Sequence, residues 1–293
     1  AWGSSHGATR IFRVAYRDPL YSRLAADAIP VWRELEEQSG QVLLEQTGQL
    51  DHGHAAAIDD IQATLQAGGW TFDRLSPADA HDRWPGMVFD SHVIYSPDGG
   101  RVFADRTVEA QTSLAQRNGA DVRFSLPATR IAPSGDGVRV DTADGSWEAS
   151  AVIVAAGAWL TQLEGLTDFG ITRPHVEVTA QQPVHFGIRP GFRFPSYVHH
   201  RDGAAGGNTV AAVTYGLESP GEGVKVGLDR TYPVTDLTAR TLETSADLTA
   251  QAAAYAEEWL PGHGFKFAPR IGSMAADLAM GAEQQTPQWR LSA

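Results

Sequence analysis

The chain has 293 residues, of which 42% are hydrophobic and 20% charged, and its formal net charge is −12. This composition is that of a globular protein large enough for one large or two ordinary domains. The acidic balance argues against nucleic acid or an anionic membrane as the main partner. The absence of cysteine excludes disulfides, thiolate metal sites and cysteine nucleophiles on this chain. No apolar run reaches the ~18 residues of a transmembrane helix and no signal peptide is evident, so a cytoplasmic protein is expected.

The first half of the chain predicts helices separated by short strands. Apolar residues at helical spacing, followed by a glycine, predict a helix over residues 19–39. Residues 41–50 predict a strand. Further helices are expected over 55–67, from Ser76 as a short helix with an acidic first turn, and over 105–117.

The second half of the chain is richer in strands. Alternation from Gly137, with an Asp-Gly turn after it, predicts a hairpin whose return strand covers 147–154. The end of that strand is wholly apolar, as in the buried strands of layered α/β proteins. Residues 171–227 predict more strands, and helices are expected over 235–260 and 265–280. The alternation of α/β stretches with a strand-rich block predicts two domains, each assembled from discontinuous pieces.

Three motifs contain glycines that could face an anionic or electron-rich ligand, and each has a plain structural alternative. Residues 3–10 combine small residues with Arg10, so they form either a ligand-facing turn or an ordinary surface turn. The small residues of 152–159 either give a ligand room at a strand end or fill a packing corner. Residues 262–267 either present a helix start and Lys266 to an anion or form a capping turn.

Lys225 lies between two valines in the segment Gly-Val-Lys-Val-Gly at 223–227. On a strand, Lys225 points to the face opposite both valines. If the valines face the core, Lys225 faces either solvent or a cavity, and solvent is the usual outcome.

The ten histidines show no metal-ligand spacing. His199 and His200 point to opposite faces of a strand, which is a poor chelate, so no metal site is predicted.

Taken together, the motifs resemble one known family over nearly the whole chain. The matching segments, in order, are GSSHGATRIFRVAY, Arg83-Trp-Pro-Gly86, VIVAAGAW, Tyr215-Gly216 with GVKVG after it, and GHGFKF. They resemble the monomeric sarcosine oxidases and N-methyltryptophan oxidases, FAD-dependent amine oxidases of the D-amino acid oxidase superfamily. The resemblance implies a mixed α/β (α+β) fold. It consists of a Rossmann-like FAD-binding domain, incomplete here, over 1–51, 106–170 and 262–293, and a substrate domain with a large antiparallel sheet over 52–105 and 171–261.

The resemblance also implies roles for individual residues. Arg13 and Lys266 would clamp the substrate carboxylate, a task suited to two cations. Lys225 would lie near the flavin, where its charge assists electron transfer to oxygen. Tyr215 would line the substrate pocket, and His6 would act beside the reacting groups. The residues placed against the flavin are Ser5, His6, Thr9, Arg10, Ala156, Gly157, Trp159, Gly262, Gly264, Phe265 and Lys266.

Three departures from the family pattern bear on these expectations. The family opens with a strand, a G-x-G-x-x-G turn and a helix that cradle the FAD pyrophosphate, and the printed sequence starts just downstream of them. A second gap, which includes the cysteine of the covalent flavin link, falls between Gly262 and His263. We expect both segments to be omitted because they are disordered without FAD, leaving a chain break at that point and an open groove beside Gly157. Asp229 replaces a pocket histidine of the sarcosine oxidases, so the substrate need not be sarcosine.

The expected reaction is oxidation of the C–N bond of a secondary amino acid, N-methylated or cyclic, to an imine. FAD is the expected cofactor, and O2 is reduced to hydrogen peroxide. The expected partners are the small-molecule amino acid and O2, without nucleic acid or membrane, in a monomer or small homo-oligomer. Two alternatives stay open: a dehydrogenase or deaminating oxidase acting on another amine, and a flavin-free or vestigial binding protein.

Overall fold

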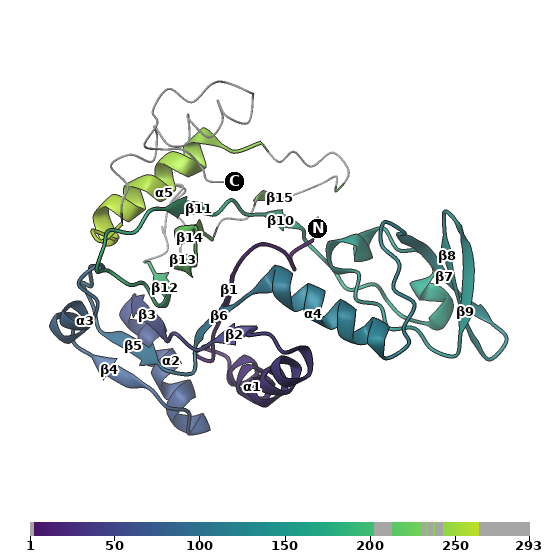
Figure 1. The fold of residues 1–293 in the computed structure, drawn as a ribbon, viewed down its shortest axis with the longest axis horizontal. Helices are drawn as coiled ribbons and strands as arrows, with labels where there is room; N and C mark the ends of the chain where they lie inside the picture. Colours follow the sequence, from purple (N-terminus) through teal and green to yellow (C-terminus); the bar gives the residue numbers. More distant parts are fainter. Residues whose placement is uncertain (1–2, 202–212, 230–231, 234–236, 238–242, 264–293) are drawn as a thin grey trace.

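A computed structural model describes residues 3–201, 213–229, 232–233, 237 and 243–263 (Figure 1). The helices are α1 (Pro19–Ser39), α2 (Ala55–Gly68), α3 (Pro77–Arg83), α4 (Ala104–Arg117) and α5 (Ala246–Trp259), with short 3-10 turns η1 (Gly157–Thr161) and η2 (Leu166–Phe169). The first strands are β1 (Arg10–Phe12), β2 (Leu44–Glu45), β3 (Gln49–Gly53), β4 (Asp73–Leu75), β5 (Val93–Ser96), β6 (Gly100–Val102), β7 (Ala128–Ser134), β8 (Gly137–Thr142) and β9 (Gly145–Ala149). The remaining strands are β10 (Thr179–Ala180), β11 (Val184–Phe186), β12 (Ser196–His200), β13 (Val213–Ser219), β14 (Gly223–Leu228) and β15 (Tyr232–Pro233).

The helix ends follow the capping signals of the sequence. Asp18 caps α1 by accepting a hydrogen bond from the Leu20 amide at 2.8 Å, and Gly40 ends it with a left-handed φ of 68°. Ser76 caps α3 in the same way, accepting from the Asp79 amide. The helices predicted over 19–39, 55–67, from Ser76 and over 105–117 are therefore confirmed within one or two residues.

A seven-stranded sheet in the order β11-β14-β13-β12-β3-β5-β4 forms the centre of the larger part of the molecule. Its neighbouring strands are antiparallel except β3 and β12, which pair in parallel. The single strand predicted over 41–50 is wrong. It is two strands, β2 and β3, because the backbone turns at Gly48 with a φ of 83° and donates there to the Gly99 carbonyl.

The seven-stranded sheet has two different faces because side chains alternate along each strand. Beneath α5, one face forms the largest core, which includes Leu50, Phe186, Tyr197, Val224, Val226, Ala252, Tyr255, Ala256 and Leu260. The strand register places Tyr215, Gly227 and Lys225 on the other face. Helix α2 covers the far end of that second face, where Ile58 and Ile61 pack against Ile94 of β5. Chemistry at Lys225 is therefore separated from the α5 core by the sheet itself.

A smaller sheet, β7-β8-β9, lies at the opposite end of the molecule, with α4 between it and the larger part (Figure 1). The predicted hairpin is present, but its return strand ends at Ala149 rather than at 154. Residues 151–156 form no strand, and Ile153 is 93% exposed. The predicted buried strand is wrong because no described strand pairs with it, and a buried strand of this type needs neighbours. Its valines instead line an apolar hollow of about 390 Å³ with Ile131 and Leu166.

The chain continues directly from Gly262 to His263, so the predicted break at that point is wrong. The two residues form a turn after α5, in which the His263 amide donates to the Leu260 carbonyl at 2.9 Å. The helix predicted over 265–280 lies outside the described residues, as do Gly264, Phe265 and Lys266. Within the described ranges, none of the helices combines the length and the apolarity needed to cross a bilayer.

Candidate active site

Lys225 lies in the middle of β14 and is only 5% exposed. Its neighbours Val224 and Val226 are fully buried in the α5 core, so Lys225 points to the other face of the sheet, as strand alternation predicts. There it meets the chain just before β1. The Nζ atom donates to the Thr9 carbonyl oxygen at 2.7 Å and to Thr9 Oγ1 at 3.1 Å. Lys225 therefore does not take the solvent position that is usual for such a lysine.

A chain of hydrogen bonds continues from this lysine to the turn between β13 and β14. Thr9 Oγ1 donates to Ser219 Oγ at 3.0 Å, and Ser219 Oγ donates to a Glu222 carboxylate oxygen at 2.7 Å. Both residues that bond to Thr9, Lys225 and Ser219, belong to the β13–β14 hairpin, and Glu222 lies in its turn. Burial, and then the charge of Arg10, lowers the pKa of Lys225 to about 8, while Glu222 opposes the shift. Lys225 is therefore mostly charged at neutral pH.

The segment before β1 is fixed in place by the start of α4. The Gly7 amide donates to Asp105 Oδ1 at 2.8 Å, and the Asp105 amide donates to the Gly7 carbonyl at 3.2 Å. Gly7 has a φ of 91°, and an added Cβ would lie 3.0 Å from an Arg10 guanidinium nitrogen. Glycine therefore permits both the turn and the close approach of Arg10.

Several residues predicted to face the flavin meet along this segment. Arg10 donates to the Thr9 carbonyl at 3.0 Å and to the Ser4 carbonyl at 3.3 Å. His6 is exposed, and its Nδ1 bonds the Gly3 carbonyl. The Trp159 ring is within 3.5 Å of a Cβ placed on Gly3. The structure thus brings His6, Thr9, Arg10, Trp159 and Lys225 to one region of the molecule.

Tyr215 lies on the same face of the sheet as Lys225 and belongs to a second hydrogen-bond network. Its hydroxyl donates to Gln181 Oε1 at 2.7 Å, and Gln181 Nε2 donates to Asp229 Oδ1 at 2.8 Å. Burial, with the Asp229 carboxylate nearby, raises the pKa of Tyr215, so its hydroxyl stays protonated as a donor. No sequence motif pointed to Gln181, because its role depends on where the chain runs after β10.

Arg13 is half-buried and its Nε has no hydrogen-bond partner among the described residues. Its guanidinium stacks on the Tyr16 ring at 4.1 Å from the centroid. A buried guanidinium nitrogen without a partner is costly, and an anion placed there would satisfy it. Lys266, the second predicted clamp residue, lies outside the described residues.

The remaining predicted residues are spread over three parts of the chain. Ser5 is exposed on the N-terminal segment, while Ala156 and Gly157 stand at the start of η1, where Gly157 has a φ of 54°. Gly262 packs elsewhere, where its amide donates to the Gly86 carbonyl. An added Cβ on Gly262 would lie 2.7 Å from Gly86 Cα, so close backbone packing accounts for this glycine.

The chain is similar to known proteins over most of its length. Residues 1–262 match the family model described as "DAO: FAD dependent oxidoreductase". A monomeric sarcosine oxidase of Streptomyces avermitilis is 29% identical over 95% of this chain and 84% of its own length. An N-methyl-L-tryptophan oxidase of Yersinia pestis is 29% identical over 55% of this chain, and the matched part is 45% of its own length. The structure of NikD, described as an unusual amino acid oxidase essential for nikkomycin biosynthesis, superposes with a TM-score of 0.73 at 23% identity, covering 90% of this chain and 70% of that one.

The family match over residues 1–262 identifies an FAD-dependent oxidoreductase. The chain belongs to the FAD-dependent oxidoreductase family, and among named relatives it is similar to the sarcosine and N-methyltryptophan oxidases. The expected mixed α/β fold, the family and the FAD cofactor are therefore confirmed. The buried Lys225 cation, held on the Thr9 carbonyl, fits an electron-rich flavin beside the N-terminal segment.

Proposed function

We propose that this protein oxidises the C–N bond of a secondary amino acid, N-methylated or cyclic, and passes the electrons to O2. The proposal rests on the buried Lys225 cation, which donates to the Thr9 carbonyl. A sarcosine oxidase is similar to 95% of this chain. FAD, when bound, supplies the acceptor for the hydride that leaves the substrate carbon. Loss of that hydride and of one proton gives the imine, which water hydrolyses. O2 takes up two electrons and two protons to give hydrogen peroxide.

Lys225 is placed to stabilise negative charge as it develops on oxygen. A cation fixed in a site with little water interacts more strongly with such charge than one in bulk solvent, and it needs no reorganisation during the reaction. The Thr9 carbonyl and hydroxyl fix the position of Nζ, since both accept from it. Glu222 lies at the end of the hydrogen-bond chain rather than on Nζ, so the positive charge of Lys225 is not neutralised by a direct ion pair.

Arg13 binds the substrate carboxylate in this proposal. Its unpartnered Nε and the packing of its guanidinium on Tyr16 hold a cation ready without a competing carboxylate. Lys266 is the second cation proposed for the same carboxylate. Tyr215 and Gln181 form one wall of the substrate pocket, and Asp229, held by Gln181, gives that wall an acceptor for a substrate N–H. The same proposal divides the chain into an FAD-binding part, 1–51, 106–170 and 262–293, and a substrate-binding part, 52–105 and 171–261.

The proposal is tested by peroxide formation from a matched panel of amines. The purified protein, supplied with FAD, is given sarcosine, N-methyl-L-tryptophan, L-proline, the corresponding primary amino acids, and N-methylamines without a carboxylate. Peroxide from the secondary amino acids, with much lower kcat/KM for the other two groups, supports it. Preference for primary amino acids would indicate a deaminating oxidase, and substrate-dependent dye reduction without peroxide would indicate a dehydrogenase. Either result contradicts the proposal.

A further inference from the structure

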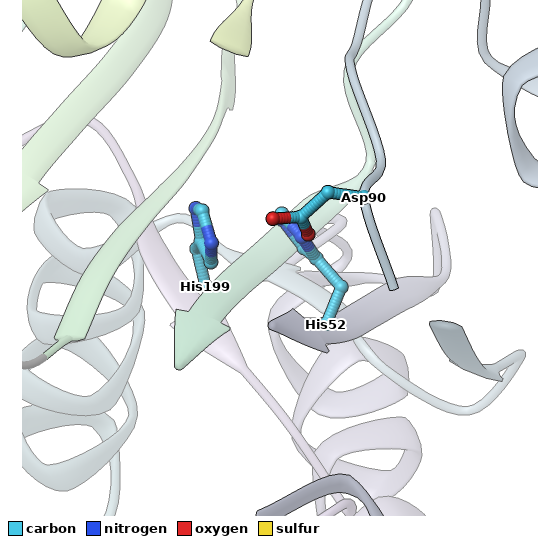
Figure 2. Close-up of side chains that lie close together, drawn as sticks. All are labelled: His52, Asp90 and His199. Carbon is cyan, nitrogen blue, oxygen red and sulfur yellow. The ribbon is translucent and has the colours of Figure 1, made fainter. Parts of the chain in front are cut away.

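A second group of polar side chains lies on the opposite face of the seven-stranded sheet from Lys225. His52 of β3 and His199 of β12 are directly paired in the parallel register of these strands. Asp90 comes from the loop between α3 and β5, and its carboxylate lies over the His52 ring with His199 facing both (Figure 2). The nearest ligand atoms of the three side chains all lie within 4.8 Å of one another.

His52 has an unusual environment for a core histidine. It is 1% exposed, and neither of its ring nitrogens has a hydrogen-bond partner in the part of the chain that the structure describes. Its contacts are with rings: it stacks on His199 with centroids 4.1 Å apart and meets the edge of Phe89 at 5.2 Å. Buried polar atoms are nearly always bonded, so two unpartnered nitrogens on one ring call for a ligand that the protein itself does not supply.

His199 is oriented by its surroundings. Its Nδ1 lies 3.2 Å from the Tyr255 hydroxyl of α5, and Trp259 meets its ring edge-on at 4.4 Å. A histidine that binds a metal commonly has its second ring nitrogen held in this way, which leaves Nε2 for the ion.

We propose that His52, His199 and Asp90 bind a divalent transition-metal ion of the Zn2+ type. Two imidazoles and one carboxylate are a donor set that suits zinc and neighbouring transition ions and does not suit Mg2+ or Ca2+. The spacing of His199 and His200 gave no sign of this site, because the partner of His199 is a residue on another strand. The ion ties the Asp90 loop to β3 and β12, and its position behind the sheet makes it structural rather than catalytic.

The side chains must move closer together to hold an ion. Ligand atoms about 2.1 Å from a tetrahedral metal lie about 3.4 Å apart, so atoms that now lie up to 4.8 Å apart must approach by as much as about 1.4 Å. Asp90 is exposed on a loop and can make that movement. The two rings lie 25° from parallel and must turn to aim their lone pairs at one point. No described hydrogen bond restrains His52 in its present orientation.

Titration calorimetry with ZnCl2 tests the proposal on the untagged protein after treatment with a chelator. One Zn2+ per chain is expected, with no binding of Mg2+, and Co2+ in the site should give visible d–d absorption. Asp90→Asn, at an exposed position, should weaken Zn2+ binding at least tenfold, and His52→Gln should abolish it. Asp82→Asn and His175→Gln are the matched controls, since both residues are exposed and outside the cluster. These two variants should bind Zn2+ as the unchanged protein does.

Two results would overturn the inference. One is the absence of stoichiometric Zn2+ binding to the folded, unsubstituted protein. The other is binding that Asp90→Asn leaves unchanged, which would assign the ion to other residues. Because Asp90 lies on the surface, its variant is expected to fold even if His52→Gln does not, and circular dichroism checks this. Zn2+ should also raise the Tm of the unsubstituted protein by a few degrees and leave that of Asp90→Asn almost unchanged.

Discussion

The Lys225 Nζ atom donates to the Thr9 carbonyl oxygen at 2.7 Å, although the two residues are 216 positions apart in the sequence. This bond joins the segment before β1 to the middle of the large sheet. A β14 lysine becomes a buried cation rather than a surface charge because Thr9 supplies two acceptors for it. The position of the charge therefore depends on the threonine as much as on the lysine.

Thr9→Val should lower the free energy of unfolding by about 1–3 kcal/mol, as for a buried polar group that loses a partner. The substitution removes the hydroxyl that accepts from Lys225 and donates to Ser219, while the shape of the side chain is kept. Urea denaturation measures the change. Thr172→Val, at an exposed position, should change stability by no more than about 0.5 kcal/mol. Equal effects of the two substitutions would show that the Thr9 hydroxyl contributes nothing specific.

Lys225→Met should slow flavin reoxidation by O2 far more than it slows flavin reduction by substrate, because the charge acts where oxygen becomes negative. In the unsubstituted protein the reoxidation rate constant should fall as the pH rises through about 8, since Lys225 loses its proton there. The variant should lose this pH dependence. Stopped-flow measurement of each half-reaction separates the two effects, and unchanged reoxidation in the variant would remove Lys225 from this role.

Arg13→Met should weaken the binding of a carboxylate inhibitor by at least about 2 kcal/mol, which is roughly 30-fold in Kd. Arg13 is half-buried and its Nε has no hydrogen-bond partner among the described residues. A bound carboxylate therefore does not compete with a protein acceptor for this nitrogen. Arg17→Met is the control, because Arg17 is exposed and pairs with Asp60. Inhibitor titration followed by flavin absorbance gives both constants. An equal loss for a carboxylate inhibitor and for its uncharged amide analogue would contradict the clamp.

Gly227→Ala should lower kcat/KM by at least about tenfold while leaving FAD affinity nearly unchanged. A Cβ at this position would collide with the Tyr215 ring, which lies across Gly227 on the neighbouring strand. The backbone of Gly227 is not in the left-handed region, so strain of the main chain is not the cause. Tyr215→Phe is the matched variant, because it removes the bond to Gln181 and keeps the ring in place. Unchanged kinetics in Gly227→Ala would show that the Tyr215 ring does not line the pocket.

Much of the helical structure was predictable because its signals are local. Asp18 before Pro19 and the glycine at position 40 define both ends of α1, and each acts through atoms only a few residues away. The strand predictions were less accurate. Gly48 divides one predicted strand in two, and Ile153 is exposed in what was predicted to be a buried strand, because sheet pairing depends on distant partners.

Residues of the candidate sites that depend on distant partners were likewise not predictable from the sequence. The resemblance pointed to Lys225 and Arg13, whereas Gln181 entered the site only through its bonds to Tyr215 and Asp229. His52 and His199 meet because two strands far apart in the sequence pair in parallel, and no spacing within either strand contains that information. The resemblance therefore predicted roles for residues near the N-terminal segment but not for the polar group behind the sheet.

Oxidation of secondary amino acids is tested by mixing the FAD-loaded protein with one of them in the absence of oxygen and then admitting oxygen. Sarcosine, N-methyl-L-tryptophan or L-proline should remove the absorbance of oxidised flavin. Oxygen should then restore that absorbance, with one molecule of hydrogen peroxide formed for each flavin. A protein that binds FAD but whose flavin none of these amino acids reduces would contradict the account.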